Sequence, residues 1–180
     1  FFNQHRAILL RAEREFGVPA EIIVAIIGVE TSYGRVAGSY RVLDALSTLA
    51  FDYPPRAPFF TAQLKDFLIL TRDQGMDPTG LMGSYAGAMG YGQFMPSSYR
   101  NYAIDFDQDG KIDIWENPGD AIGSVANYFK QHGWRQGDAV VAAAVAAANT
   151  PDTIFVKTRD ELKPQRTVAQ FAADGLVARV

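Results

Sequence analysis

The sequence predicts a mainly α-helical protein with a single core and a small C-terminal segment that could contain β-strands. Apolar residues recur at three-to-four spacing through most of the first 130 positions, and glycine or proline stands where these segments end. In addition, 48% of the 180 residues are hydrophobic, which is enough for one sizeable core. We therefore expect a core at residues 1–134 and a truncated accessory segment at 135–180.

The first two predicted helices are residues 5–16 and 20–33. The first places apolar side chains on one face and charged side chains on the other, as in an amphipathic surface helix. The second is apolar nearly all round, which predicts a helix buried in the middle of the domain. A buried β-strand is the alternative, but the length of the segment and the positions of Pro19 and Gly34 favour a helix.

Two further helices are predicted at residues 42–51 and 57–72, joined by an extended turn because two consecutive prolines stand between them. Residues 77–95 are rich in glycine and aromatic residues and have little periodicity, which indicates an ordered loop. The alanine-rich run 138–150 contains valines that suit short strands, so helix and strand both stay open there.

Composition and charge exclude several classes of function. The 17 basic and 20 acidic side chains leave a net charge of −3, so we expect no nucleic-acid partner. There is no cysteine, hence no disulfide or zinc–thiolate site, and no apolar run of about 18 residues that would predict a transmembrane helix. The first residues show neither an initiator methionine nor a leader, so we interpret the chain as a fragment or a processed form.

Glu30 is the first candidate catalytic residue. It follows Ile26 and Ile27 by one helical turn, so its carboxyl group continues an apolar stripe, where we expect it to be partly buried. Burial beside aliphatic groups favours the protonated form of a carboxyl group, which is the form that a general acid needs. The structural alternative is an ion pair with a nearby base such as Arg35.

Residues 83–94 are the second candidate feature. Four glycines allow close approach of the backbone to a ligand, Tyr85, Tyr91 and Phe94 offer flat faces for sugar rings, and Gln93 offers a donor and an acceptor. No Gly-Lys-Ser/Thr follows the glycines, so a phosphate-binding loop is not predicted. The alternative is a tightly packed connection whose aromatic residues belong to the core.

Residues 105–116 match the EF-hand loop pattern D-x-D-x-D-G-x5-E in full. Asp105, Asp107 and Asp109 occupy positions 1, 3 and 5, where carboxylates converge on a hard cation, and the backbone carbonyl of Lys111 stands at position 7. Glu116 occupies the usual closing position. The loop therefore predicts a calcium site.

Three segments and this acidic loop, in this order, closely resemble the lytic transglycosylase B family (MltB-type). They are residues 28–35 (GVETSYGR), 43–46 (LDAL) and 84–99 (SYAGAMGYGQFMPSSY), and the resemblance covers about residues 12–134. These bacterial enzymes cleave the glycan strands of peptidoglycan. The resemblance implies a lysozyme-like helical core with an EF-hand-like loop at 105–120.

The resemblance implies that Glu30 is the only catalytic carboxyl group, acting first as acid and then as base. The substrate bond is β-1,4, between N-acetylmuramic acid and N-acetylglucosamine, and the product is a 1,6-anhydromuramoyl sugar. The sequence shows no second carboxylate of the kind that ordinary glycosidases need. A lysozyme-type hydrolase and a calcium-dependent glycan-binding module without turnover stay open as alternatives.

The resemblance also implies contacts with the substrate and a closing ligand for the metal. The implied substrate-binding residues are Ser84, Gln93, Phe94, Arg56, Phe59 and Tyr128. For the metal, the family closes a longer loop with the aspartate that begins the next helix, which is Asp120 here, with Glu116 as the alternative. Calcium is expected to stabilise the fold and to take no part in the chemistry.

One departure and several wider expectations follow from the resemblance. The family completes its groove with a later Tyr-Asn pair, whereas Ala148 precedes Asn149 in this chain. We expect a monomer without an organic cofactor, acting on peptidoglycan glycan strands. The expected location is the periplasm or cell envelope of a bacterium, with a lipid anchor to the outer membrane as one route if an N-terminal segment is missing.

Overall fold

The computed structural model describes residues 1–148, 150–155 and 166–179. Its internal contacts divide the chain into two compact units, Phe1–Gln136 and Gly137–Val180. The sequence places this boundary at residue 134. Among the described residues, no helix is both long enough and apolar enough to cross a lipid bilayer.

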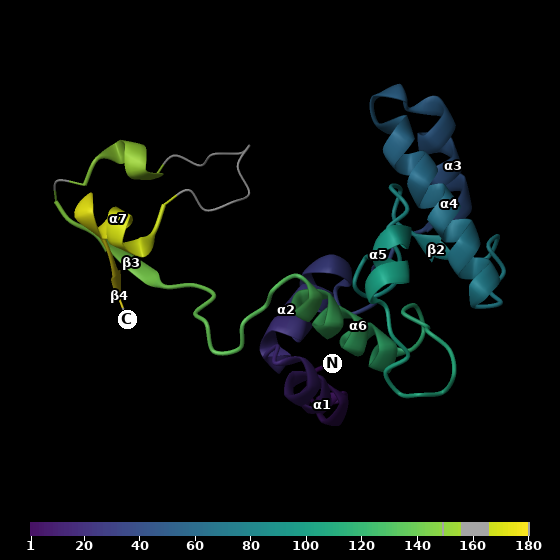
Figure 1. The fold of residues 1–180 in the computed structure, drawn as a ribbon, viewed down its shortest axis with the longest axis horizontal. Coiled ribbons are helices and arrows are strands. Elements are labelled where there is room, and N and C mark those ends of the chain that lie inside the picture. The colour runs from purple at the N-terminus through teal and green to yellow at the C-terminus, as the bar shows by residue number, and fades with distance from the viewer. Residues whose placement is uncertain (149, 156–165, 180) are drawn as a thin grey trace. The chain divides into compact units, whose positions relative to one another are not determined.

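Three helices form the base of the first unit: α1 (Arg6–Phe16), α2 (Ala20–Thr31) and α6 (Pro118–Gln131). They contact one another pairwise and lie together in Figure 1. Their facing side chains are apolar and fully buried, so that packing of these faces holds the base together. The buried residues include Leu9, Ala12, Ile23, Ile27 and Ile122.

Helix α2 confirms the helix predicted from Ala20 onward, but the prediction that it is buried on all sides is wrong. Its buried residues fall on one face, whereas Val29 on another face is 82% exposed. The reason is that α2 contacts α1 and α6 without being enclosed by a further helix of the described chain.

Helices α3 (Val42–Asp52) and α4 (Ala57–Asp73) form a hairpin that extends away from the base (Figure 1). Leu46 and Phe67 are fully buried in this unit. The connection is a 3-10 turn, η1 (Pro54–Arg56), in place of the predicted extended turn. The fixed φ of proline is compatible with a 3-10 helix, and Arg56 N donates to Tyr53 O at 3.2 Å to close the turn.

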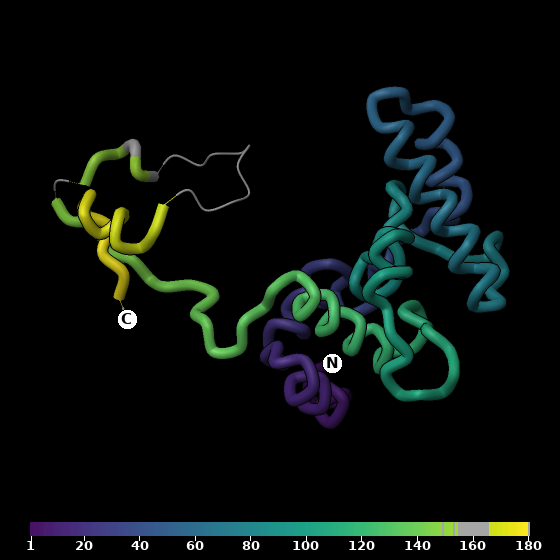
Figure 2. The backbone as a smooth tube through the Cα atoms, in the orientation of Figure 1, coloured from purple at the N-terminus to yellow at the C-terminus, as the bar shows by residue number. Residues whose placement is uncertain are grey.

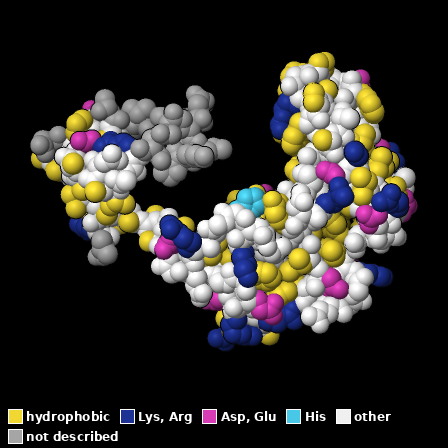
Figure 3. Space-filling view, viewed as in Figure 1, with side chains coloured by type: hydrophobic (Ala, Val, Ile, Leu, Met, Phe, Trp, Pro, Cys, Tyr) yellow, Lys and Arg dark blue, Asp and Glu magenta, His cyan; other side chains and the backbone are white. Residues whose placement is uncertain are grey.

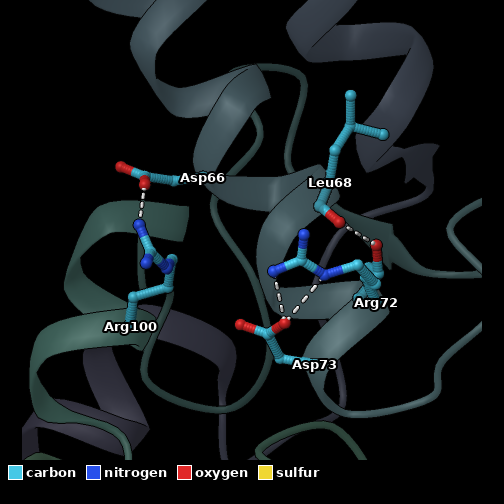
Figure 4. A network of polar contacts seen from close by, with 6 residues as sticks. Asp66, Leu68, Arg72, Asp73 and Arg100 are labelled. Carbon is cyan, nitrogen blue, oxygen red and sulfur yellow. Dashed lines mark hydrogen bonds and ion pairs between the residues drawn. The ribbon is translucent and has the colours of Figure 1, made fainter.

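Polar contacts tie the hairpin to α5 (Pro96–Tyr102). The buried Gln63 of α4 accepts a hydrogen bond from Ser97 N at 3.0 Å, at the start of α5. One turn further along each helix, Arg100 forms an ion pair with Asp66, as Figure 4 shows. The hairpin is therefore fixed to the base through α5, which also contacts α6.

The glycine-rich segment is an ordered connection, as predicted, that carries very short β-pairings. Strand β2 (Met82–Gly83) pairs antiparallel with β1 (Tyr40–Arg41), and single bridges join Met89 to Gly83 and to Phe94. Beyond α5, the chain forms the long acidic loop that leads to α6, traced in Figure 2. Both segments gain their order from contacts with distant residues.

The second unit contains the antiparallel pair β3 (Ala143–Ala146) and β4 (Leu176–Arg179), with η2 (Asp152–Phe155) and α7 (Val168–Ala173) between them in the chain. The open question about the alanine-rich run is therefore answered by a strand at Ala143–Ala146. Helix α7 begins with a capping box between Thr167 and Gln170. Asn149, considered for the Tyr-Asn pair, lies outside the described residues.

Candidate active site

A cavity of about 310 Å³ opens between the end of α2, the start of α5 and helix α6. Four of the residues that the sequence singles out line it together: Glu30, Gln93, Phe94 and Tyr128. They come from three segments that are far apart in the chain. The tertiary structure thus brings an acid, an amide and two aromatic rings to one place.

Glu30 is exposed, so the prediction of a partly buried carboxyl group is wrong. It stands one residue before the end of α2, where the helix surface faces the open cavity and not the core. The structural alternative is not observed either, because Arg35 Nε donates to Ser32 O at 3.0 Å. Among the described residues, the Glu30 carboxylate has no hydrogen-bond or ion-pair partner, which leaves both oxygens available to a ligand.

The backbone around the cavity has an unusual conformation. Ser32, Tyr33 and Gln93 have positive φ values of 50°, 65° and 50°, which are costly for residues other than glycine. At Ser32 and Tyr33 this conformation ends α2, beginning two residues after the acid. Strain of this kind persists only where surrounding contacts hold it, and it is concentrated at functional sites.

Gln93 lines the cavity, and its side-chain amide nitrogen already donates hydrogen bonds within the protein. Its Nε2 donates to Ala37 O at 3.1 Å and to Gly90 O at 3.0 Å. Its Oε1 accepts no hydrogen bond from the described residues. The sequence predicts that Gln93 offers a ligand both a donor and an acceptor. In the structure only the acceptor, Oε1, remains available to a ligand.

Aromatic rings form one wall of the cavity. Tyr128 of α6 lies 5.7 Å from Phe94, centroid to centroid, and packs edge-on against Tyr102 at 5.2 Å. His132 stacks on the Tyr128 ring at 3.9 Å and closes the end of α6. This packing fixes the orientation of Tyr128, so that its ring presents a flat apolar surface to the cavity.

Three predicted contact residues are not among those that line this cavity. Ser84 Oγ accepts from Ala86 N at 3.2 Å and from Ala88 N at 3.0 Å, so it holds a turn. Arg56 lies over the Phe59 ring at 4.5 Å, and both side chains are exposed on the hairpin. Their contact with substrate stays a prediction.

Sequence reasoning missed several residues of the cavity wall. Ser98 brings a hydroxyl group from the first turn of α5, and Phe129 follows Tyr128 on α6. Ser98 is part of the quoted PSSY run, which is the signal that could have identified it. Tyr91, predicted to offer its ring face to sugars, is not among the residues that line this cavity, and its ring packs so closely against Gly34 that an added Cβ there would lie 2.2 Å from it. Its contact with substrate stays a prediction.

The acidic loop brings three carboxylates together. One oxygen of each of Asp105, Asp107 and Asp109 lies within 4.8 Å of the others. The glycine at position 6 of the loop, Gly110, has the positive φ of 91° that the sharp turn requires. Hard oxygen ligands at this spacing fit a calcium ion.

The loop is fastened to the core through its own backbone. Ile112 N donates to Gln74 Oε1 at 3.2 Å, and Tyr99 Oη donates to Ile112 O at 2.6 Å. Burial, together with the negative charges of Asp113 and Asp120, raises the pKa of Tyr99. The tyrosine hydroxyl therefore stays protonated and keeps this bond.

Asp120, the predicted closing ligand, is fully buried at the start of α6. Its two oxygens accept from Phe106 N at 2.7 Å and from Asp113 N at 2.8 Å, which joins the two sides of the loop. Burial raises the pKa of this carboxyl group, Asp107 adds to the effect, and the backbone hydrogen bonds oppose it. Glu116 is exposed, and among the described residues neither it nor Asp120 belongs to the group of three converging carboxylates, so the closing ligand stays a prediction.

Comparison with known proteins identifies relatives of this chain. Residues 1–179 match the model of the transglycosylase SLT domain family. The membrane-bound lytic murein transglycosylase B of Escherichia coli (strain K12) is 54% identical over 176 residues, which are 98% of this chain and 46% of that protein.

Solved structures of related proteins share the fold of this chain. The soluble lytic transglycosylase SltB1 from Pseudomonas aeruginosa is 56% identical with a TM-score of 0.93, covering 99% of this chain and 59% of that one. The E. coli lytic transglycosylase Slt35 in complex with calcium is 52% identical with a TM-score of 0.89, covering 99% and 55%. The chain spans about half the length of the relatives it matches. It has their lysozyme-like helical fold, and it belongs to the transglycosylase SLT domain family.

Proposed function

We propose that this chain is the catalytic part of a lytic transglycosylase that cleaves peptidoglycan glycan strands. The observation that carries the proposal is the position of Glu30, which faces a cavity with an aromatic wall and has no partner among the described residues. The relatives named for lytic transglycosylase activity support it.

The lining of the cavity favours transglycosylation over hydrolysis. Among the described residues that line it, Glu30 is the only acid. Glycosidases that use a nucleophile or activate a water molecule need a second carboxylate on the other side of the scissile bond. A reaction without water needs only one group that can give a proton and take another.

In the proposed reaction, protonated Glu30 donates its proton to the oxygen of the β-1,4 bond between N-acetylmuramic acid and N-acetylglucosamine. The bond from C1 of the muramoyl sugar to that oxygen breaks, and the 2-acetamido group stabilises the resulting positive charge. The C6 hydroxyl of the same sugar then bonds to C1, and its proton passes to the Glu30 carboxylate. The product is a 1,6-anhydromuramoyl end, and no water is consumed.

The cavity walls supply the apolar surface and the hydrogen-bond acceptor that would hold the sugar. Tyr128 and Phe94 offer apolar surface for a sugar ring, and Gln93 Oε1 can accept a hydrogen bond from a hydroxyl or amide group. A bound glycan would cover Glu30 and exclude water, which the open cavity of the free protein does not do. Ser84, Arg56 and Phe59 are proposed contacts further along the strand.

Mass spectrometry of fragments released from purified peptidoglycan tests this function. We expect anhydro fragments, lighter by one water than hydrolytic products, and a loss of about 10²–10⁴-fold in the Glu30→Gln variant. Glu21→Gln is the matched control, because Glu21 is an exposed acid on the same helix but outside the cavity. Reducing ends would indicate a hydrolase, and binding without release would indicate a glycan-binding module.

The proposal includes a calcium ion held by Asp105, Asp107, Asp109, the Lys111 carbonyl and Asp120, with a structural role. The convergence of three carboxylates and the calcium complex of the relative Slt35 support it. When bound, the ion would neutralise the clustered negative charge and tie α5 to α6. We further propose a monomer at the peptidoglycan layer of a bacterial cell envelope, in line with the relative that is named as membrane-bound.

A further inference from the structure

A second cavity, of about 210 Å³, lies where the N-terminal half of α3 meets the turn that follows β2. Its volume is below the roughly 300–1,000 Å³ of pockets that enclose drug-sized ligands, so it suits one small ring. The proposed reaction does not use it. It is lined by Tyr40, Asp44, Ala45, Thr48, Leu49 and Tyr85.

Two tyrosines dominate the opening of this cavity. Tyr40 is 57% exposed and Tyr85 is 73% exposed, although neither is near a chain terminus. Buried aromatic rings contribute to a core, whereas exposed rings at the mouth of a cavity leave a large apolar surface in water. Such rings stack well on the apolar face of a pyranose, and their hydroxyl groups can bond to its polar edge.

Polar groups of the right kind stand beside the rings. The Asp44 carboxylate accepts from Arg41 Nη2 at 2.6 Å, which holds it at the start of α3. Thr48 follows Asp44 by one helical turn and adds a hydroxyl group on the same side of the helix. A carboxylate, a hydroxyl and two aromatic faces together match the alternating apolar and hydroxyl surfaces of a sugar.

The turn that carries Tyr85 is rigid. Ser84 N donates to Ala88 O at 2.9 Å, and Ser84 Oγ accepts from Ala88 N at 3.0 Å. Gly87, with a φ of 81°, lies so close to Leu46 of α3 that an added Cβ would be 2.4 Å from that side chain. The exposure of Tyr85 is therefore fixed by the fold and does not result from a loose loop.

The cavity is also connected to Glu30 through ordered backbone. Residues 32–39 lead from the end of α2 to Tyr40, and Gln93 of the first cavity donates to Ala37 O within this stretch. Gly38 packs against Gly83, where an added Cβ would lie 2.0 Å from the carbonyl oxygen. The two cavities are thus linked through one hydrogen-bonded and closely packed stretch of the first unit.

We propose that the cavity between Tyr40 and Tyr85 binds a hexopyranose ring of the glycan, as a site additional to the one beside Glu30. The inference rests on the proposed function, since the same polymer is the ligand. A strand that is held at two places dissociates more slowly than one held at one place, because the second contact is intramolecular.

Binding of a defined oligosaccharide tests this site independently of turnover. In a Glu30→Gln background, the dissociation constant for a hexamer of β-1,4-linked N-acetylglucosamine is measured by calorimetry for Tyr40→Ala and Tyr85→Ala. We expect binding to weaken about tenfold in each, as for an aromatic residue at the centre of an interface. Phe51→Ala is the matched control, because Phe51 is 74% exposed on the same helix and does not line the cavity.

A second measurement does not depend on the tyrosine variants. In the NMR spectrum of the Glu30→Gln protein, the hexamer should shift the amide resonances of Asp44, Thr48 and Tyr85 as well as those of Gln93. Unchanged affinity in both tyrosine variants, or shifts confined to the cavity beside Glu30, would overturn the proposal. If the unmodified protein released no anhydro products while the Glu30→Gln protein still showed these shifts, the proposed reaction would be refuted and this site would stand.

Discussion

The hydroxyl of Thr31 lies 3.0 Å from the carbonyl oxygen of Tyr91, 60 residues away in the chain. It also lies 3.1 Å from Ile27 O, to which it can donate instead, and it accepts from Gly34 N at 2.9 Å. Thr31 is buried, and it directly follows Glu30. One side chain therefore joins the end of the helix that carries the acid to the loop that carries Gln93.

Removal of this hydroxyl should destabilise the protein and misplace the acid. We expect Thr31→Val to lower the free energy of unfolding by about 1–3 kcal/mol, because Gly34 N loses its buried acceptor. Thr31→Ser keeps the hydroxyl and should lose less. Urea unfolding followed by circular dichroism measures both, and a Val variant as stable as the Ser variant would contradict the role of the hydroxyl.

A pair of glycines with nearly the same backbone conformation separates conformational strain from steric overlap. Gly90 has a φ of +65° and an added Cβ would lie 2.4 Å from Ile114 O, whereas Gly75 has a φ of +64° and no atom within 4 Å. Both alanine variants share the cost of positive φ, about 1 kcal/mol. We expect Gly90→Ala to lose at least about 2 kcal/mol more than Gly75→Ala in urea unfolding.

The overlap between a Cβ added at Gly90 and Ile114 O explains why Gly90→Ala should lose more stability than Gly75→Ala. Gly90 precedes Tyr91, whose N–H donates to Ile114 O at 3.0 Å, so the overlap would push the glycine-rich segment away from the acidic loop. Equal losses in the two variants would show that this packing is not needed for stability.

Removal of calcium should lower the melting temperature. At a calcium concentration 100 times the dissociation constant, binding stabilises the folded state by about 2.7 kcal/mol, which corresponds to a shift of roughly 5–10 °C for a chain of this size. Excess chelator should abolish the shift, and Asp107→Asn should be insensitive to calcium. Asp73→Asn, an exposed acid outside the loop, should keep the full response.

The same measurement identifies the closing ligand. We expect Asp120→Asn to lose the calcium-dependent part of the melting shift, and Glu116→Gln to keep it. The calcium-dependent difference is the relevant quantity, because Asp120 also accepts two backbone hydrogen bonds and its loss destabilises the metal-free protein. The opposite pattern would assign the closing position to Glu116.

The attachment of the α3–α4 hairpin to α5 should depend more on the buried amide of Gln63 than on the ion pair between Asp66 and Arg100. Asp66 and Arg100 are 20% and 40% exposed, so a double-mutant cycle should give a coupling of less than about 1 kcal/mol. Gln63→Ala removes the buried acceptor of Ser97 N and should cost about 1–3 kcal/mol. A coupling larger than the Gln63 loss would reverse this ranking.

The sequence was sufficient for the first four helices and for four of the residues that line the cavity, Glu30, Gln93, Phe94 and Tyr128. Helical spacing over a few turns depends on neighbouring residues only, which is why α1 to α4 begin and end close to their predicted positions. The acidic loop could also be identified from the sequence, because its carboxylates and glycine occupy fixed positions in one short segment.

Only the tertiary structure decided which groups face a ligand and which are used within the protein. The exposure of Glu30, the commitment of the Gln93 amide nitrogen to Ala37 and Gly90, and the outward position of Tyr85 depend on distant contacts. The strand at Ala143–Ala146 likewise exists because β4 pairs with it. Local sequence sets backbone periodicity, whereas burial and hydrogen-bond partners come from residues that meet only after the chain has folded.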